Sequence, residues 1–430
     1  MFKTIANAWK MAELRKKILF TVMVILLYRI GTALPVPFLD ASVLSSSLLS
    51  SQGSLFQYLN ILSGGAMSQA TLFALGVQPY ITASIVIQLL TIALPPLERL
   101  SKEGEEGRKK LNQITRYVTV GLALVTAFGY YKLLDNNGAI TRKGVYPAII
   151  IILAYCAGSS LVMWLAEKVN DKGIGNGISL ILFANIVSRL PSMIGNLWNG
   201  YLSTGKALEI CIGIGVIIVS LASVALIVFI TDSERRIPIQ YAKKVVGRKM
   251  YGGQSSNLPL KVNMTGVMPI IFANSIVSLP ATIALFFPTP AKGTFWYTFQ
   301  QLFSSDGWLY AVLTGVLIIA FAYFYVTISF NPIEVSNNLK KNGGFIPGIR
   351  PGKPTSDYIT KVLSRVTLIG AVFLVVIAVF PLIANIMSGA KLSALAFTGS
   401  SIIIVVGVVL ETARELESQM TMRHYKGFLE

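Results

Sequence analysis

The sequence predicts an all-α membrane protein of ten transmembrane helices, arranged as two inverted five-helix halves with one short re-entrant helix. Of the 430 residues, 53% are hydrophobic and only 13% are charged, whereas globular domains carry about 25% charged residues. Ten apolar runs reach the length needed to cross a hydrocarbon core about 30 Å thick. A local repeat relates the second run to the seventh. These three observations together define the predicted fold.

The ten runs are separated by polar or glycine-rich segments. They lie at 18–34, 72–94, 117–134, 147–166, 177–194, 208–230, 264–287, 309–330, 363–387 and 393–411. Basic residues precede the first run, but no small-residue cleavage pattern follows it, so it is interpreted as a retained span. Arg189 and Pro191 interrupt the fifth run. The first five runs form a predicted N-terminal half, 1–206, and the next five a C-terminal half, 207–411.

The basic residues are distributed unequally between the two sides of the membrane. Segments that alternate onto one side contain 28 of the 37 Lys and Arg residues, and those on the other side contain seven. The positive-inside rule then places both termini, the large loops 231–262 and 331–362, and the tail 412–430 in the cytoplasm. The net charge of +18 is therefore a one-sided topology signal.

A short apolar segment, 55–66, precedes the second run. As a helix it would extend about 18 Å, which is too short to span the membrane. Gly64 and Gly65 then break it before the longer run 72–94 begins. Discontinuous segments of this kind occur where protein or a water-filled cavity surrounds them. The segment is therefore predicted to line a passage.

The second and seventh runs share a local pattern. Residues 76–83 (GVQPYITA) and 266–273 (GVMPIIFA) are identical at their Gly, Val, Pro, Ile and Ala positions. Each is the second run of its half, and an odd number of spans per half gives the halves opposite orientations. Pro79 and Pro269 each remove a helical hydrogen bond, so we expect both helices to bend there. The functional path is expected between the halves.

The chemistry of common membrane enzymes is missing from the sequence. The single histidine, His424, lies in the tail, so Ser159 and Ser160 have no histidine base within the membrane. All six aspartates fall outside the apolar runs, and no P-loop or HExxH motif occurs. We therefore expect no catalytic residue, no metal site and no cofactor. The middle of each run also lacks Asp, Glu, Lys and His, which favours an apolar gate over an ion-coupled transporter.

The two long cytoplasmic loops are basic and punctuated by glycine and proline. Alternation of apolar and basic residues predicts twisted hairpins that project from the membrane. Their length exceeds what joining neighbouring helices requires, so a protein or ribosomal-RNA partner is expected. The alternative is that they serve only as topology determinants or headgroup contacts.

Four motifs, in order, resemble the SecY family, the central subunits of the bacterial protein-conducting channel. The resemblance covers essentially the whole chain. The motifs are FALGVQPYITASI at 73–85, GIGNGIS at 173–179, LPLKVN at 258–263 and FIPGIRPG at 345–352. The resemblance implies a passive pore that moves unfolded secretory polypeptides across the bacterial plasma membrane and releases transmembrane helices sideways into lipid.

By motif position, the resemblance also implies a ring of apolar side chains at the waist of an hourglass pore. These residues are Val77, Ile81, Ile178, Leu182, Ile271 and Ile404. Ile81 and Ile271 are also equivalent positions of the repeat. The short segment then corresponds to the plug that fills the outer funnel of the idle channel, with residues Leu55, Phe56, Tyr58, Leu59, Ile61, Leu62, Gly64 and Gly65.

The implied partners follow from the same resemblance. Arg236 and Arg350 match basic loop residues that the family uses to engage the ATPase SecA or the ribosome. Lys243, Lys244 and Arg248 are assigned to the same docking surface. SecE is the expected small subunit that clamps the halves, and SecG a peripheral one. Signal sequences would leave through a side opening between the second and third and the seventh and eighth helices.

Two other functions remain open at this point. A secondary transporter of a hydrophobic solute would take up solute along its gradient as purified protein. A non-conducting insertase or scaffold would insert helices without exporting soluble chains.

Overall fold

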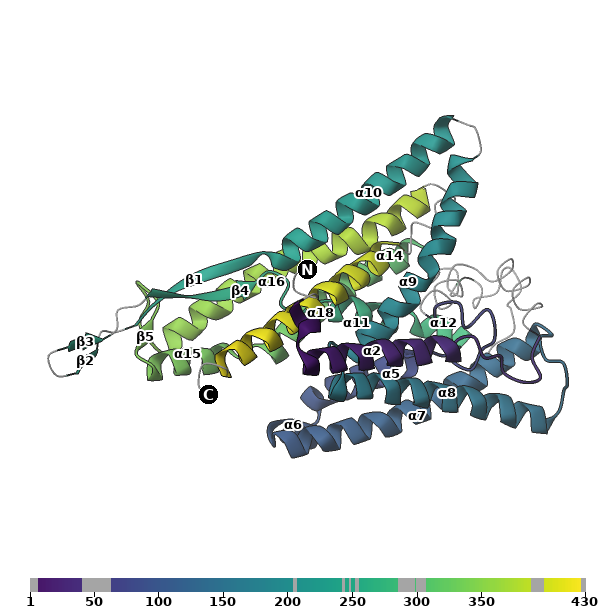
Figure 1. Cartoon of the computed structure of the whole chain (residues 1–430), viewed down its shortest axis with the longest axis horizontal. Helices are drawn as coiled ribbons and strands as arrows, with labels where there is room; N and C mark the ends of the chain where they lie inside the picture. Colours follow the sequence, from purple (N-terminus) through teal and green to yellow (C-terminus); the bar gives the residue numbers. More distant parts are fainter. Residues whose placement is uncertain are drawn as a thin grey trace.

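The computed structural model describes residues 7–40, 63–203, 207–241, 244–246, 249–251, 255–284, 298, 307–387 and 398–426. It is a bundle of long helices from which a β arm projects at one end (Figure 1). The small hairpin β2–β3 forms the far tip of this arm. The fold is predominantly helical, as the composition predicts.

The first half of the chain supplies one group of helices. They are α2 (Ala12–Gly31), α5 (Gln78–Ala93), α6 (Pro95–Lys102), α7 (Glu105–Asn136), α8 (Val145–Lys172) and α9 (Gly177–Leu197), which continues as the π-helix η1 (Trp198–Leu202). Helix α7 packs between α5 and α8, and α2 packs on α8. In Figure 1, α2, α5, α6, α7 and α8 lie along the lower side of the bundle, whereas α9 rises toward the upper end of α10.

The second half supplies the remaining helices. They are α10 (Ala207–Asp232), α11 (Met268–Val277), α12 (Leu279–Ala284), α14 (Trp308–Ser329), α15 (Pro332–Lys341), α16 (Lys353–Met387) and α18 (Thr398–Lys426). Helix α14 packs against α11 and α16, and α18 packs against α10 and α16. The two groups meet where α5 contacts α11, where α7 contacts α12 and where α9 contacts α18.

The described helices give a lower span count than the apolar runs. Six of them are individually long and apolar enough to cross a membrane, namely α7, α8, α9, α10, α14 and α16. The pair α5–α6, bent by 100°, raises the number to seven if it forms one span. The chain is thus a multi-pass membrane protein, and the count of ten remains a prediction.

The two prolines of the repeat lie at the starts of their helices and do not bend them, which corrects the sequence prediction. Helix α5 begins at Gln78 and α11 at Met268, so Pro79 and Pro269 lie in the first turn, where no intrahelical N–H is needed. The preceding glycines have matching positive φ angles, 54° at Gly76 and 62° at Gly266. The repeat is therefore present in the backbone as well as in the sequence.

The second apolar run is not helical from its start at residue 72. Residues 72–77 form turns, and the Leu72 N–H donates to the Leu34 carbonyl at the end of α2 (2.9 Å). The Phe73 ring stacks on Tyr28 of α2, with centroids 5.6 Å apart. The left-handed Gly76 prevents the helix from starting earlier, because that conformation cannot continue an α-helix.

Two further helices run through positions where the sequence predicted an end or a break. Helix α9 continues through Arg189 and Pro191. Helix α18 continues without a break through residue 411 to Lys426, so most of the predicted tail is an extension of the last helix.

The two long loops contribute strands to one shared sheet, which confirms one predicted hairpin and corrects the other. Strand β1 (Glu234–Tyr241) pairs antiparallel with β4 (Ser255–Lys261), and β2 (Lys244–Val246) pairs with β3 (Lys249–Tyr251). The second loop contributes α15 and the short strand β5 (Gly344–Phe345), which adds to the free edge of β1. A separate apolar core containing Ile237, Leu260 and Ile359 holds this arm together.

Candidate functional site

The six predicted ring residues converge in one apolar cluster. Five are buried within it: Val77 and Ile81 of the α5 start, Leu182 of α9, Ile271 of α11 and Ile404 of α18. Ile178, in the first turn of α9, is half-buried and packs against the same cluster. The left-handed glycine of each repeat lies two residues before its helix, so the turn sets where the helix begins. The first turns of both helices then lie in this cluster.

The side chains that form this cluster are uncharged. Among the residues that the structure describes, the buried polar side chains are threonine, serine and asparagine only. The five buried ring side chains are each at most 4% exposed. Aliphatic side chains have no directional bonding requirement, so this arrangement excludes water and can reshape around different contents.

Gly64 and Gly65 are the only residues of the predicted plug within the described part of the chain. Both have positive φ, 68° and 91°. A Cβ at Gly64 would lie 2.8 Å from Asn185 Oδ1, and one at Gly65 would lie 2.7 Å from Arg189 Nη2. The backbone therefore needs glycine at both positions. Leu55, Phe56, Tyr58, Leu59, Ile61 and Leu62 lie outside the described residues.

A polar contact joins the two groups of helices beside the ring. The Gln78 side chain, at the start of α5, donates to Ser278 Oγ at the end of α11 (3.0 Å). A cavity of about 40 Å³ next to Gln78 is lined by Leu182 and by threonines of α7 and α12. This seam joins the second and seventh apolar runs, where the resemblance predicts a side opening.

The predicted docking residues that the structure describes lie on the β arm. Arg236 of β1 is exposed and forms an ion pair with Glu234 (Nε to Oε1, 2.6 Å). Arg350 follows β5 and is also exposed. Pairing of β5 with β1 places both loops in one sheet. The backbone of Lys244 lies in β2, whereas Lys243 and Arg248 lie outside the described residues.

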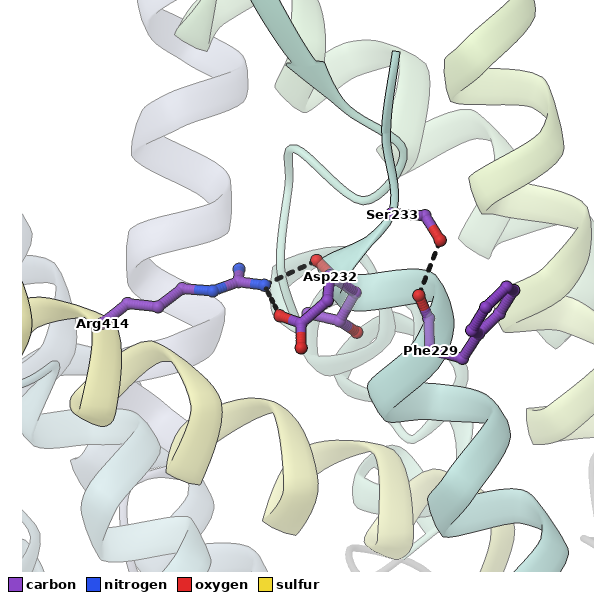
Figure 2. A network of polar contacts seen from close by, with 5 residues as sticks. Phe229, Asp232, Ser233 and Arg414 are labelled. Carbon is purple, nitrogen blue, oxygen red and sulfur yellow. Dashed lines mark hydrogen bonds and ion pairs between the residues drawn. The ribbon is translucent and has the colours of Figure 1, made fainter. Parts of the chain in front are cut away.

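The root of the β arm is fixed by a network of polar contacts (Figure 2). Arg414 of α18 donates to the Thr231 carbonyl (2.6 Å) and pairs with the Asp232 carboxylate at the end of α10. Ser233 Oγ donates to the Phe229 carbonyl (2.6 Å). Burial lowers the pKa of Lys261, the last residue of β4, and the nearby Arg414 cation lowers it further. The arm is therefore rooted on α18 as well as on α10.

Several of these residues were missed by sequence reasoning. Arg29 reaches the Ala184 carbonyl of α9 (3.2 Å), yet from sequence it appeared only as a residue near a span end. Gln78 carried a visible signal, because it is polar between two apolar ring positions. Arg414 carried none, because one basic residue in a predicted tail is unremarkable.

Comparison with solved structures identifies the class of the fold. The chain aligns with "The structure of a protein conducting channel" at a TM-score of 0.67, with 18% identity, over 94% of this chain and 92% of that one. It aligns with "Sec61 in the Canine ribosome-channel complex from the endoplasmic reticulum" at a TM-score of 0.63, with 18% identity and the same coverage. The architecture is that of membrane protein-conducting channels.

Sequence comparison then identifies the family. The SecY family model matches residues 71–413. The chain is 42% identical to protein translocase subunit SecY of Streptomyces galbus, over the full length of both proteins. It is 40% identical to that of Mycobacterium tuberculosis, again over both full lengths. The chain belongs to the SecY family.

Proposed function

We propose that this chain is the passive protein-conducting subunit of a Sec translocon, and not a catalytic enzyme. It moves unfolded secretory polypeptides across the bacterial plasma membrane and releases transmembrane helices into lipid. The observation that carries the proposal is the convergence of the six ring residues from four helices in one uncharged apolar cluster. Family membership supports it independently.

The ring acts as a seal, and its side chains adjust to the polypeptide that passes through it. In the idle state the aliphatic side chains contact one another and exclude water. When a polypeptide enters, the same side chains contact it through non-directional dispersion forces, which tolerate varied sequences. The segment before Gly64 serves as the plug on the outer side. The chain has no nucleotide-binding motif, so a partner supplies the energy.

The seam between α5 and α11 is the proposed exit for signal helices. Here a side-chain hydrogen bond from Gln78 to Ser278 accompanies the apolar contacts. A signal helix would stabilise the open state through contacts that the closed state does not offer, which shifts the population toward it.

The proposed partners match two surfaces. An apolar groove of about 420 Å³ lies between α9, α10 and α18, with exposed Leu190, Ile217 and Leu221. It touches helices of both predicted halves, which suits the clamping helix of SecE, with SecG placed peripherally. The basic β arm, with Arg236, Arg350 and the lysines near its tip, is the proposed docking site for SecA or the ribosome. In this proposal the arm and both termini lie in the cytoplasm.

Crosslinking tests the pore assignment. A cysteine at Ile81 is expected to crosslink to a secretory chain stalled during export. The matched control is a cysteine at Val86 on the same helix, which is 39% exposed and lies outside the ring. Labelling of Ile81→Cys by lipid probes alone, with no crosslink to the stalled chain, would contradict the proposal.

A charge reversal tests the docking surface. Arg350→Glu is expected to abolish ATPase-driven export while the membrane complex still assembles. Normal export by this variant would refute the docking role, whereas loss of assembly would show a structural role instead.

A further inference from the structure

The C-terminal part of α18 contacts four separate segments of the chain. We define the α18 connector as residues 411–420, just beyond the predicted end of the last span. Its side chains reach the turn before α11, the loop before α9, the root of the β arm, and α2. One stretch of helix is thus placed between the docking surface and the ring.

Two carboxylates of the connector hold the starts of two ring helices. Glu415 Oε2 accepts a hydrogen bond from the Gly175 N–H (2.9 Å), three residues before Ile178. The Glu411 carboxylate packs against Gly266, five residues before Ile271, in the turn that precedes α11. Carboxylates that accept backbone N–H groups at helix N-termini make charge-assisted bonds favoured by the helix dipole.

The glycines at these two contacts show how closely the connector approaches. A Cβ at Gly266 would lie 1.9 Å from Glu411 Oε1, and one at Gly175 would lie 3.0 Å from Thr412 Oγ1. Both glycines also have positive φ. The connector therefore packs directly against the turns that aim α9 and α11 at the ring.

The same stretch of helix holds the β arm. Arg414 lies between the two carboxylates in sequence and binds the Thr231 carbonyl and the Asp232 carboxylate (Figure 2). The Ser233 carbonyl accepts from the Val262 N–H (2.9 Å), which closes the base of the β1–β4 hairpin beside this contact. A displacement of the hairpin base is thus passed directly to Arg414.

The far end of the connector is fixed to α2. Leu416 is buried in a small apolar cluster with Leu14 and Ile174. Gln419 accepts from the Lys17 ammonium (3.0 Å) and donates to Glu415 (3.0 Å). The carboxylate that holds the α9 loop is therefore itself oriented by a hydrogen-bonded chain to α2.

We infer that Glu411, Arg414 and Glu415 are positioning residues that couple the β arm to the ring. A partner that displaces the hairpin base moves α18, and α18 moves the starts of α9 and α11 with it. Ile404, on α18 itself, moves as part of the same helix. Positions 411, 414 and 415 lie on one face of the helix, so one tilt of α18 affects all three contacts. This inference rests on the proposed function and adds the route by which docking opens the channel.

The test compares Arg414→Gln with a matched control, Arg116→Gln. Arg116 forms an ion pair of similar kind with Glu167, between α7 and α8 (2.8 Å), away from the connector. Each purified channel complex is reconstituted in proteoliposomes. Three quantities are measured: the affinity for the driving ATPase, the ATP-dependent import of a secretory precursor at saturating ATPase, and the thermal unfolding midpoint.

Arg414→Gln is expected to lower import about tenfold while ATPase affinity and the unfolding midpoint stay at the control's values. Arg414→Lys, which keeps the ion pair, is expected to restore most of the import. Equal import by Arg414→Gln and Arg116→Gln would overturn the inference. So would loss of ATPase affinity in Arg414→Gln, because the contact would then only fold the arm.

A second variant keeps the inference testable if Arg414→Gln does not fold. Glu415→Ala removes the contact to the α9 loop without touching the arm, and import is again expected to fall at unchanged ATPase affinity. Unchanged import in this variant would count against the connector. Failure of the unaltered complex to import any precursor would contradict the proposed function instead, so the two failures are distinguishable.

Discussion

The turns that precede α5 and α11 have the same backbone conformation, but different side chains contact them. Gly76 and Gly266 have φ angles of 54° and 62°, and the valines that follow have φ angles of −89° and −91°. Behind the first turn, Ser159 Oγ donates to the Gly76 carbonyl (3.4 Å). Behind the second turn stands the Glu411 carboxylate.

This difference shows what the repeat specifies and what it leaves free. The G-V-x-P pattern sets the turn and the helix start, because glycine permits positive φ and proline suits the first helical turn. The neighbours of each turn come from distant parts of the chain. In this protein a carboxylate of α18, the helix that also contacts the root of the β arm, packs against the second turn, and a neutral hydroxyl contacts the first turn.

The largest difference between the turns is expected from alanine at the two glycines. Gly76→Ala has no side-chain clash, since the nearest atom to its Cβ is 4.0 Å away, and it costs about 1–2 kcal/mol for the left-handed conformation alone. Gly266→Ala adds a collision with Glu411, so its loss of stability is expected to be larger. Thermal unfolding in detergent measures both, and equal midpoints would contradict the difference.

The next largest difference is expected from removing the two supports. Glu411→Ala removes the carboxylate that packs against the second turn, and a loss of about 0.5–3 kcal/mol is expected. Ser159→Ala removes a neutral hydrogen bond of 3.4 Å, and about 1 kcal/mol or less is expected. Unfolding midpoints again provide the measurement. A larger effect at Ser159 would reverse the comparison.

A smaller effect is expected from making the two turns identical at their variable position. Gln78→Met reproduces the second turn and removes the hydrogen bond to Ser278, worth about 0.5–1.5 kcal/mol. The seam should then open more readily, so less hydrophobic signal sequences should be exported. Gln78→Glu would serve as a polar control. An unchanged hydrophobicity threshold would show that this bond does not hold the seam.

The smallest difference is expected at the ring itself. Ile81 and Ile271 are equivalent in the repeat and are 3% and 4% exposed. Serine at either position should raise ion leak in planar bilayers, to a similar extent, because each removes aliphatic contact from the same seal. Unchanged conductance in both variants would count against the seal, and a strong asymmetry would show that the halves contribute unequally.

Much of the site was predictable because its signals are local. The G-V-x-P pattern, the apolar positions around it and the family motifs identified six residues that the structure brings into one cluster. The hairpin of the first loop was also predicted, because alternation and turn residues specify it. The helical start at 72 was wrong, since apolar composition does not reveal that Gly76 interrupts the helix.

The sequence by itself determined that this is a multi-pass helical membrane protein of the SecY family, with a repeated G-V-x-P pattern and two long basic loops. Hydropathy and local turn chemistry depend on residues that are close in sequence, so they can be predicted without the tertiary structure. Only the tertiary structure decided that β5 pairs with β1 and that Gln78 donates to Ser278. It also decided that α18 contacts the segments before α9 and α11 and the root of the β arm. Glu415 and Gly175 are 240 residues apart, and packing of the intervening helices brings them together.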